Sequence, residues 1–263
     1  MSESTVEIER RGSVAWVWMS RPALHNAFNE DLIHDLTATF RTLAQDTAVR
    51  AIVLSGRGKS FSAGADINSM KRQGAADREA NLESARRLAE MFHVLAASPK
   101  PTVARVNGAA IGGGLGLVCC CDIAIAAGCA VFAASEVRLG LIPATIGPYV
   151  VRAIGPRRAR RLFLTCERIS AGQAEKIGLI HEVAEAEQLD AATDVILNNL
   201  LAGGACAQSA AKELIDAVAH RPITSELIED TAERIAAIRS QPEAREGLSA
   251  FLEKRPASWV PQR

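Results

Sequence analysis

The stretch from residue 102 to residue 122 constrains the fold most, because it joins a buried strand to a helix through consecutive glycines. Residues 102–106 (TVARV) are β-branched and apolar enough to form a buried strand. Gly112, Gly113 and Gly114 then open a short apolar segment that predicts a helix. Glycines permit unusual backbone angles and close approach, and the first turn of a helix carries unpaired amides. Such a junction can hold an oxygen that becomes negative during a reaction.

The same glycines could also serve packing alone, as a tight turn. A dinucleotide site requires G-x-G-x-x-G before a helix, with an acidic residue about 20 residues later. Gly114 and Gly116 are followed by Val118 and Cys119, so the third glycine of that pattern is missing. The sequence therefore disfavours a nucleotide site and leaves the structural turn open as an alternative.

Strand, turn and helix signals alternate from the N-terminus to about residue 140, which predicts an α/β fold. A hairpin is expected from strands at 6–10 and 14–19, and a short buried strand at 51–55. Asn29 suits the N-cap of a helix with an apolar stripe, whereas residues 68–81 suggest a flexible surface segment. Further helices are predicted at 82–97, 156–165, 171–176, 186–201, 205–218, 223–239 and 243–253.

The charge balance excludes some partners. The chain has 263 residues, 48% of them hydrophobic, with 30 basic and 30 acidic side chains. Neutrality argues against nucleic acid or an anionic membrane as the main partner. The basic cluster at 152–161 is a local exception, which suits a solvated helix face, an RNA contact or a CoA phosphate.

The cysteines and the N-terminus suggest a reducing compartment. The six cysteines form no C-x-x-C pair and have no histidine at zinc-ligand spacing, so we expect buried thiols and no metal site. Residues 1–10 contain no apolar signal core, and no run approaches the ~18 apolar residues of a membrane span. We expect a soluble cytoplasmic protein.

Four segments together resemble the crotonase superfamily, the enoyl-CoA hydratases and isomerases. They are RPALHNA at 21–27, FSAGADI at 61–67, NGAAIGGG at 107–114 and SEVRLGLIP at 135–143. The segment FLEKR at 251–255 is similar to the usual C-terminal ending of that family. The resemblance spans essentially the whole chain. Within the superfamily, the sequence looks most like bacterial enoyl-CoA and 3-methylglutaconyl-CoA hydratases.

The resemblance implies a crotonase-like spiral of ββα units with a helical C-terminal trimerisation region. On this basis we expect a core over residues 1–200 and a helical region over 201–263, assembled as a homotrimer or a dimer of trimers. The implied substrate is an acyl-CoA thioester. Coenzyme A is then part of the substrate, and no separate cofactor is implied.

The resemblance also assigns a catalytic site. The thioester oxygen would lie between the backbone amides of Ala65 and Gly113, and Glu136 would carry the proton. Many hydratases of the family have a second glutamate, and counting back along this chain places Gly116 at that position. Glycine cannot ionise, so the sequence predicts a site with one carboxylate. From its position alone, Glu136 could instead be a charge at a solvated edge.

The remaining expected substrate contacts lie in five parts of the chain. Tyr149 could reach the acyl group or pack in the core, and Lys254 could meet a CoA phosphate or remain solvated. In the family, a neighbouring subunit often presents the residues that correspond to Phe251 and Lys254. The set is Leu24, His25, Ala27, Ala63, Asp66, Ile67, Gly112, Gly116, Tyr149, Phe251 and Lys254.

The expected reaction is hydration of a 2-enoyl-CoA thioester through a stabilised enolate, with a branched or carboxylated acyl group such as 3-methylglutaconyl as one option. The alternative is a Δ3-Δ2 enoyl-CoA isomerase that uses a single glutamate. A third option, from another class, is a homologue that binds CoA esters or RNA without catalysis.

Overall fold

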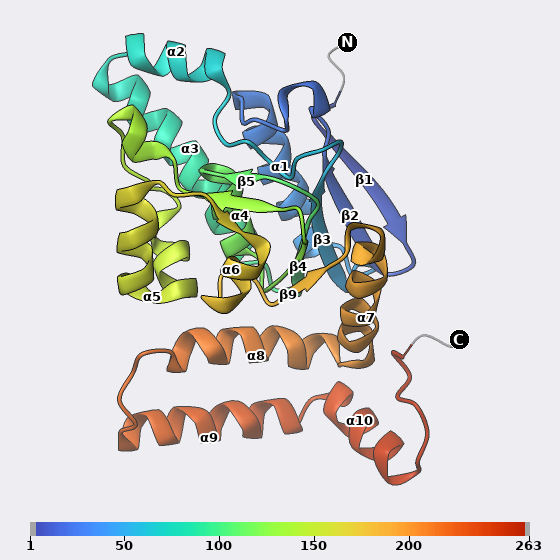
Figure 1. Cartoon of the computed structure of the whole chain (residues 1–263). Helices are drawn as coiled ribbons and strands as arrows, with labels where there is room; N and C mark the ends of the chain where they lie inside the picture. The colour runs from blue at the N-terminus through green and yellow to red at the C-terminus, as the bar shows by residue number, and fades with distance from the viewer. Residues whose placement is uncertain (1–3, 261–263) are drawn as a thin grey trace.

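The computed structural model describes residues 4–260 and contains two β-sheets surrounded by helices (Figure 1). The predicted hairpin is present: β1 (Val6–Arg11) pairs antiparallel with β2 (Val14–Met19). The main sheet has the strand order β1-β2-β3-β4-β6-β9, and every pair after the first is parallel. Its other strands are β3 (Ala51–Gly56), β4 (Thr102–Val106), β6 (Ile123–Ala127) and β9 (Glu182–Ala184).

A smaller sheet has the strand order β5-β7-β8, and it lies beside the glycine-rich junction. Its strands are β5 (Ala110–Ile111), β7 (Val131–Ala133) and β8 (Ile169–Ser170). Each strand of the main sheet from β4 onward is followed by a short strand or a helix that returns the chain to the next turn. This repetition confirms the α/β class and the predicted spiral of ββα units.

Helices cover both faces of the main sheet, since the sheet is buried on each side. One apolar cluster includes Leu36 of α1, Phe92 of α3 and Leu115 of α4, and a second cluster packs Trp16 and Val53 against α7. The helices around the sheets are α1 (Glu30–Gln45), α2 (Ile67–Ala75), α3 (Arg78–Ala96), α4 (Gly113–Cys120), α5 (Gly147–Thr165), α6 (Ala171–Lys176) and α7 (Leu189–Ala202). Three short 3-10 helices are η1 (Pro22–Leu24), η2 (Glu136–Leu139) and η3 (Ala186–Gln188).

The segment predicted to be flexible, residues 68–81, is helical instead. Asp66 accepts hydrogen bonds from the amides of Asn68 and Ser69 and so begins α2, and Asp77 accepts one from Ala80 and begins α3. The expectation was wrong because an aspartate N-cap outweighs a polar composition. The predicted N-cap at Asn29 is confirmed, since its side chain accepts from Leu32.

The last three helices form a separate layer below the rest of the chain (Figure 1). They are α8 (Ala205–Val218), α9 (Ser225–Arg239) and α10 (Pro242–Leu252). The contacts that attach α8 to the core are polar: Lys212 bonds to Asp122 at 2.7 Å, and Arg152 pairs with Asp216. The predicted division between residues 200 and 201 falls inside α7, two residues before that helix ends.

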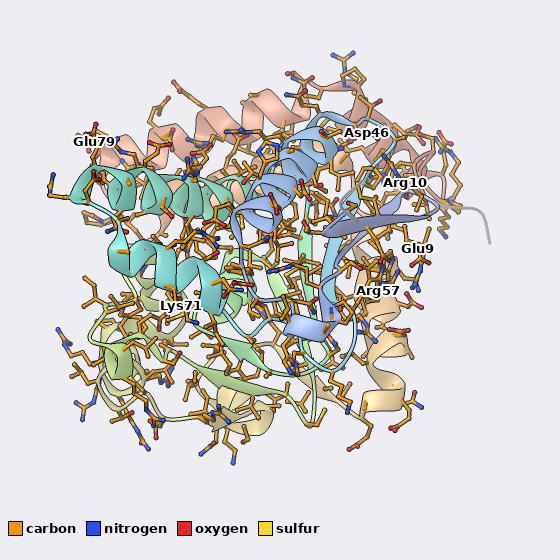
Figure 2. All side chains as sticks on the ribbon, turned by 90° about the horizontal axis from the view of Figure 1, so that it is seen from above. Glu9, Arg10, Asp46, Arg57, Lys71 and Glu79 are labelled. Atoms are coloured by element: carbon orange, nitrogen blue, oxygen red, sulfur yellow. The ribbon has the colours of Figure 1, made fainter. Side chains whose placement is uncertain are left out.

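Many charged pairs lie on the outside of the molecule. Arg10 and Asp46 lie at the same edge in Figure 2 and form an ion pair at 2.5 Å. Across residues 4–260, no helix combines the length and the apolar character needed to span a membrane.

Candidate active site

The turn at residues 62–66 and the start of α4 are held against each other. Ser62 and Ala110 form a parallel β-bridge, and the amide of Ile111 donates to the carbonyl of Ser62 at 2.9 Å. Gly64 has φ +88°, and a Cβ placed there would lie 2.8 Å from the carbonyl oxygen of Ile111 and 3.7 Å from the amide nitrogen of Gly113. Only glycine allows this approach, so the turn and the helix start form one unit.

Two backbone amides in this unit are unused. Within residues 4–260, the N–H groups of Ala65 and Gly113 donate to no acceptor, whereas the adjacent amides of Asp66 and Gly112 donate to backbone carbonyls at 2.8 Å each. Ala65 is exposed and Gly113 is half-buried, so an oxygen from outside the chain can reach the unpaired amides on these two adjoining segments. These are the two amides that the family resemblance assigns as donors, and the structure places the segments that carry them in contact.

Phe28 contacts both the turn at residues 62–66 and the start of α4. It forms a β-bridge with Ala65, and its ring lies so close to Gly113 that a Cβ there would be 2.4 Å from Cε2. A glycine at 113 is therefore required by packing as well as by the helix start. The role of Phe28 was not predicted from the sequence, although its position next to the segment 21–27 was a usable signal.

Glu136 lies directly over the glycine turn. It is the first residue of η2, and its Oε1 is 3.0 Å from the point at which a Cβ of Gly112 would stand. Its Oε2 is buried without a hydrogen-bond partner. Burial raises the pKa of the Glu136 carboxyl above its ordinary value. A half-buried carboxyl group with one unpartnered oxygen is suited to accept and return protons, unlike a carboxylate at a solvated edge.

No space is open for a side chain at Gly116, the position at which many hydratases of the family have their second glutamate. A Cβ on Gly116 would lie 2.3 Å from Cγ2 of Ile146 and 2.9 Å from Cε1 of Phe92. Both side chains are fully buried. Hydrocarbon from α3 and from the N-cap of α5 therefore fills the space that a carboxylate would need, and Gly116 contributes no side chain to the site.

The segment 24–27 and the start of α2 lie beside the turn. His25 Nδ1 is 3.0 Å from the hydroxyl of Ser60, and the amide of Ala63 donates to the carbonyl of His25. Leu24 is 50% exposed and Ile67 is 71% exposed, so both offer apolar surface to a ligand.

Two other predicted substrate contacts on these segments are buried. Ala27 is buried, and Asp66 is held by an ion pair with Arg21 at 3.1 Å and by the cap of α2. The structure gives Asp66 a positioning role for the turn, and its contact with a substrate stays a prediction.

Three predicted residues lie away from Glu136 in the single chain. The ring of Tyr149 packs against Phe92 with centroids 6.1 Å apart, and the residue lines a cavity of about 550 Å³ between α4, α5 and α8. Phe251, 80% exposed, lies in the last turn of α10, and Lys254 follows two residues after the end of that helix. One chain alone does not bring these residues to the amides.

The basic cluster lies on α5 and faces a different hollow. Arg157, Arg158 and Arg161 line it together with Lys176. Arg161 pairs with Glu167 at 2.6 Å, and Arg158 donates to a backbone carbonyl, so part of the positive charge is already engaged. No group of three metal-binding side chains occurs in the described part of the chain. Burial raises the pKa of the Cys119 thiol to about 12, which keeps it protonated.

Comparison with known proteins gives consistent matches over the whole chain. A model of the enoyl-CoA hydratase/isomerase family matches residues 9–262. A putative enoyl-CoA hydratase of Thermus thermophilus is 32% identical over 95% of this chain and 98% of its own. A crotonyl-CoA hydratase of Syntrophomonas wolfei is 32% identical over 99% of both chains. The crystal structure of an enoyl-CoA hydratase from Shewanella pealeana, 42% identical, superposes with a TM-score of 0.94 over 97% of this chain and 96% of that chain.

Proposed function

This chain belongs to the enoyl-CoA hydratase/isomerase family, and from that premise we propose that it adds water to the double bond of a 2-enoyl-CoA thioester. One observation carries the proposal: the half-buried carboxylate of Glu136, whose Oε2 has no hydrogen-bond partner in the described residues, lies beside Gly112, next to the unpaired amides of Gly113 and Ala65. This arrangement supports chemistry at the carbon next to a thioester carbonyl.

The amides of Ala65 and Gly113 receive the thioester oxygen. When a nucleophile adds to the β carbon, the electron pair of the double bond moves toward this oxygen and makes an enolate. Amides fixed by backbone packing stabilise that charge without reorganising, and losing one such donor typically costs about 2.7–4 kcal/mol of transition-state stabilisation.

Glu136 moves the protons. Its carboxylate takes one proton from a water molecule while the water oxygen bonds to the β carbon. The resulting carboxylic acid then protonates the α carbon, the enolate returns to a carbonyl, and the product is a 3-hydroxyacyl-CoA. The raised pKa of Glu136 supports the first step, because it makes the carboxylate a stronger base.

A second candidate reaction is the Δ3-Δ2 isomerisation of an enoyl-CoA. The observation that favours it is the closed space at Gly116, because moving a proton from one carbon to another needs only one carboxylate. In this reaction Glu136 takes the proton from the α carbon and returns it to the γ carbon, or the reverse.

For the acyl group we propose a branched or carboxylated chain, of which 3-methylglutaconyl is one example. The support is the resemblance of the sequence to bacterial 3-methylglutaconyl-CoA hydratases, and a substrate carboxylate could assist the water in a site that has one glutamate. Coenzyme A enters as part of the substrate, with Leu24, His25 and Ile67 along its path. The proposal assigns the protein no separate cofactor.

We further propose assembly as a homotrimer or a dimer of trimers. The support is apolar surface that a single chain leaves exposed on the last three helices. Ile228 is 58% exposed, Leu252 is 78% exposed and Phe251 is 80% exposed. In such an assembly, Phe251 and Lys254 would approach the nucleotide of a substrate bound to a neighbouring chain.

The test uses a panel of acyl-CoA esters and the absorbance of the 2-enoyl thioester. Hydration removes this absorbance, and isomerisation of a 3-enoyl ester creates it. Glu136→Gln should abolish turnover and leave CoA-ester binding largely intact. If the wild-type protein binds CoA esters and catalyses neither reaction, the non-catalytic binding protein is the correct alternative.

A further inference from the structure

The residue before Glu136 has a hydroxyl group that the fold does not use. Ser135 is the N-cap residue of η2, a position where serine normally accepts a hydrogen bond from a backbone amide. Here its backbone angles, φ −96° and ψ 0°, are helical rather than extended, and its side chain makes no capping bond. In the part of the chain that the structure describes, the Ser135 hydroxyl is therefore not used to cap η2 and makes no other hydrogen bond.

This hydroxyl lies at the site. The point at which a Cβ of Gly112 would stand is 4.0 Å from Ser135 Oγ and 3.0 Å from Glu136 Oε1. Both oxygens therefore face the same glycine, one residue before the unpaired amide of Gly113. The Ser135 side chain is half-buried, so it borders the site without being sealed off from solvent.

In a site with one carboxylate, some of the hydrogen-bonding groups of the attacking water molecule have no partner. Glu136 accepts one of the two hydrogens of the attacking water. The second hydrogen and the oxygen lone pairs need a partner that fixes the direction of attack, and hydrocarbon from Ile146 and Phe92 occupies the space beside Gly116. A hydroxyl can both donate and accept, so it can hold a water in either orientation.

We infer that the Ser135 hydroxyl and the Glu136 carboxylate together bind the water that adds to the β carbon. This inference rests on the proposed hydration. Ser135 accepts the hydrogen that stays on the water, Glu136 takes the other, and the water oxygen bonds to the β carbon. Ser135 gains and loses no proton, so it is a positioning residue for the nucleophile.

The experiment separates hydration from a partial reaction that needs no added water. Crotonyl-CoA reports hydration through the loss of enoyl absorbance. Saturated butyryl-CoA in D₂O reports exchange of the α proton by mass spectrometry, a step that uses Glu136 and the two amides only. The variants are Ser135→Ala, Ser135→Thr, which keeps the hydroxyl, and Ser240→Ala as a matched control on the exposed end of α9.

The expected result is a loss of about tenfold in kcat for hydration by Ser135→Ala, the scale of one lost hydrogen bond in the transition state. Exchange of the α proton should be unchanged in the same variant. Ser135→Thr should recover most of the hydration rate, and Ser240→Ala should match the wild type in both assays.

Two results would overturn the inference, and they differ from failure of the function. If Ser135→Ala slows hydration and exchange equally, the residue only supports the local structure. If it slows neither, the water is held elsewhere. If the wild-type protein exchanges the α proton and hydrates no enoyl ester, the proposed hydration itself is wrong, and this inference is wrong with it.

Discussion

Gly116→Ala tests whether the second carboxylate position is closed. The added methyl group would lie 2.3 Å from Ile146 Cγ2 and 2.9 Å from Phe92 Cε1, where ordinary contact begins at 3.4 Å. Ile146 and Phe92 are 1% and 0% exposed, so neither can move into solvent. Overpacking of this kind typically lowers the free energy of unfolding by about 1–3 kcal/mol.

The assay is urea denaturation at one fixed protein concentration, because association with other copies would shift the apparent stability. Ile146→Ala alone should cost about 2–5 kcal/mol, since it leaves a cavity. The double variant should cost less than the sum of the single variants, with a coupling of at least about 0.5 kcal/mol, because the new methyl group occupies part of the space that Ile146 leaves.

Gly172→Ala is the matched control. Gly172 is also helical but exposed, and a Cβ there would meet nothing within 4 Å. This change should stabilise the protein by about 0.5–1 kcal/mol, since alanine favours helices over glycine. If Gly116→Ala were as stable as the wild type, or if its effect simply added to that of Ile146→Ala, the space would be open and the one-carboxylate site would be an incorrect description.

Three further predictions concern the turn and the carboxylate. Burial raises the pKa of Glu136, so above the pKa of this residue in the unfolded chain its ionised form lowers the free energy of unfolding. Glu136→Gln should therefore be more stable than the wild type at neutral pH. The difference between the two free energies of unfolding, measured by urea denaturation, should disappear as the pH falls below the unfolded pKa. The hydration rate of the wild type, followed against pH, should fall as pH decreases through the same raised pKa, because the base becomes protonated. Gly64→Ala should lose about 1–2 kcal/mol of stability and most of its activity, since φ +88° and a contact of 2.8 Å with Ile111 both oppose a side chain; unchanged kcat would contradict the assigned turn.

The sequence was sufficient for the parts of the site that depend on backbone geometry. The resemblance to the crotonase family assigned the two amides and the carboxylate, and the packing of Gly64 against Ile111 and Gly113 places the segments with the two amides side by side. The predicted helices of the last third also match, because their apolar stripes are long and regular.

Side-chain contacts between distant segments could not be predicted. The collapse of Ile146 and Phe92 onto Gly116 joins three elements, and no local pattern encodes it. The composition of residues 68–81 suggested mobility, whereas the single aspartate at 66 was enough to begin a helix. Ser135 makes no capping hydrogen bond and has ψ 0°, and this backbone angle cannot be predicted from the residue type.

The absence of a second carboxylate does not by itself decide between hydration and isomerisation. Glu136 begins and ends both reactions as a carboxylate, so the protons balance with one glutamate in either case. What differs is the atom that supplies the proton: water in hydration, carbon in isomerisation. The choice therefore depends on whether the site holds a water next to the β carbon.

Within the described residues, Ile146 and Phe92 fill the space beside Gly116, so we expect the oxygen and the proton both to come from the side on which Glu136 lies. Oxygen and hydrogen should then arrive on the same face of the double bond. Hydration of crotonyl-CoA in D₂O, with the relative configuration of the new α deuterium and β hydroxyl determined by NMR, should give syn addition. Addition to opposite faces would require a second acid-base group, which the packing of Ile146 and Phe92 excludes from the position at 116, and that outcome would contradict the one-carboxylate mechanism.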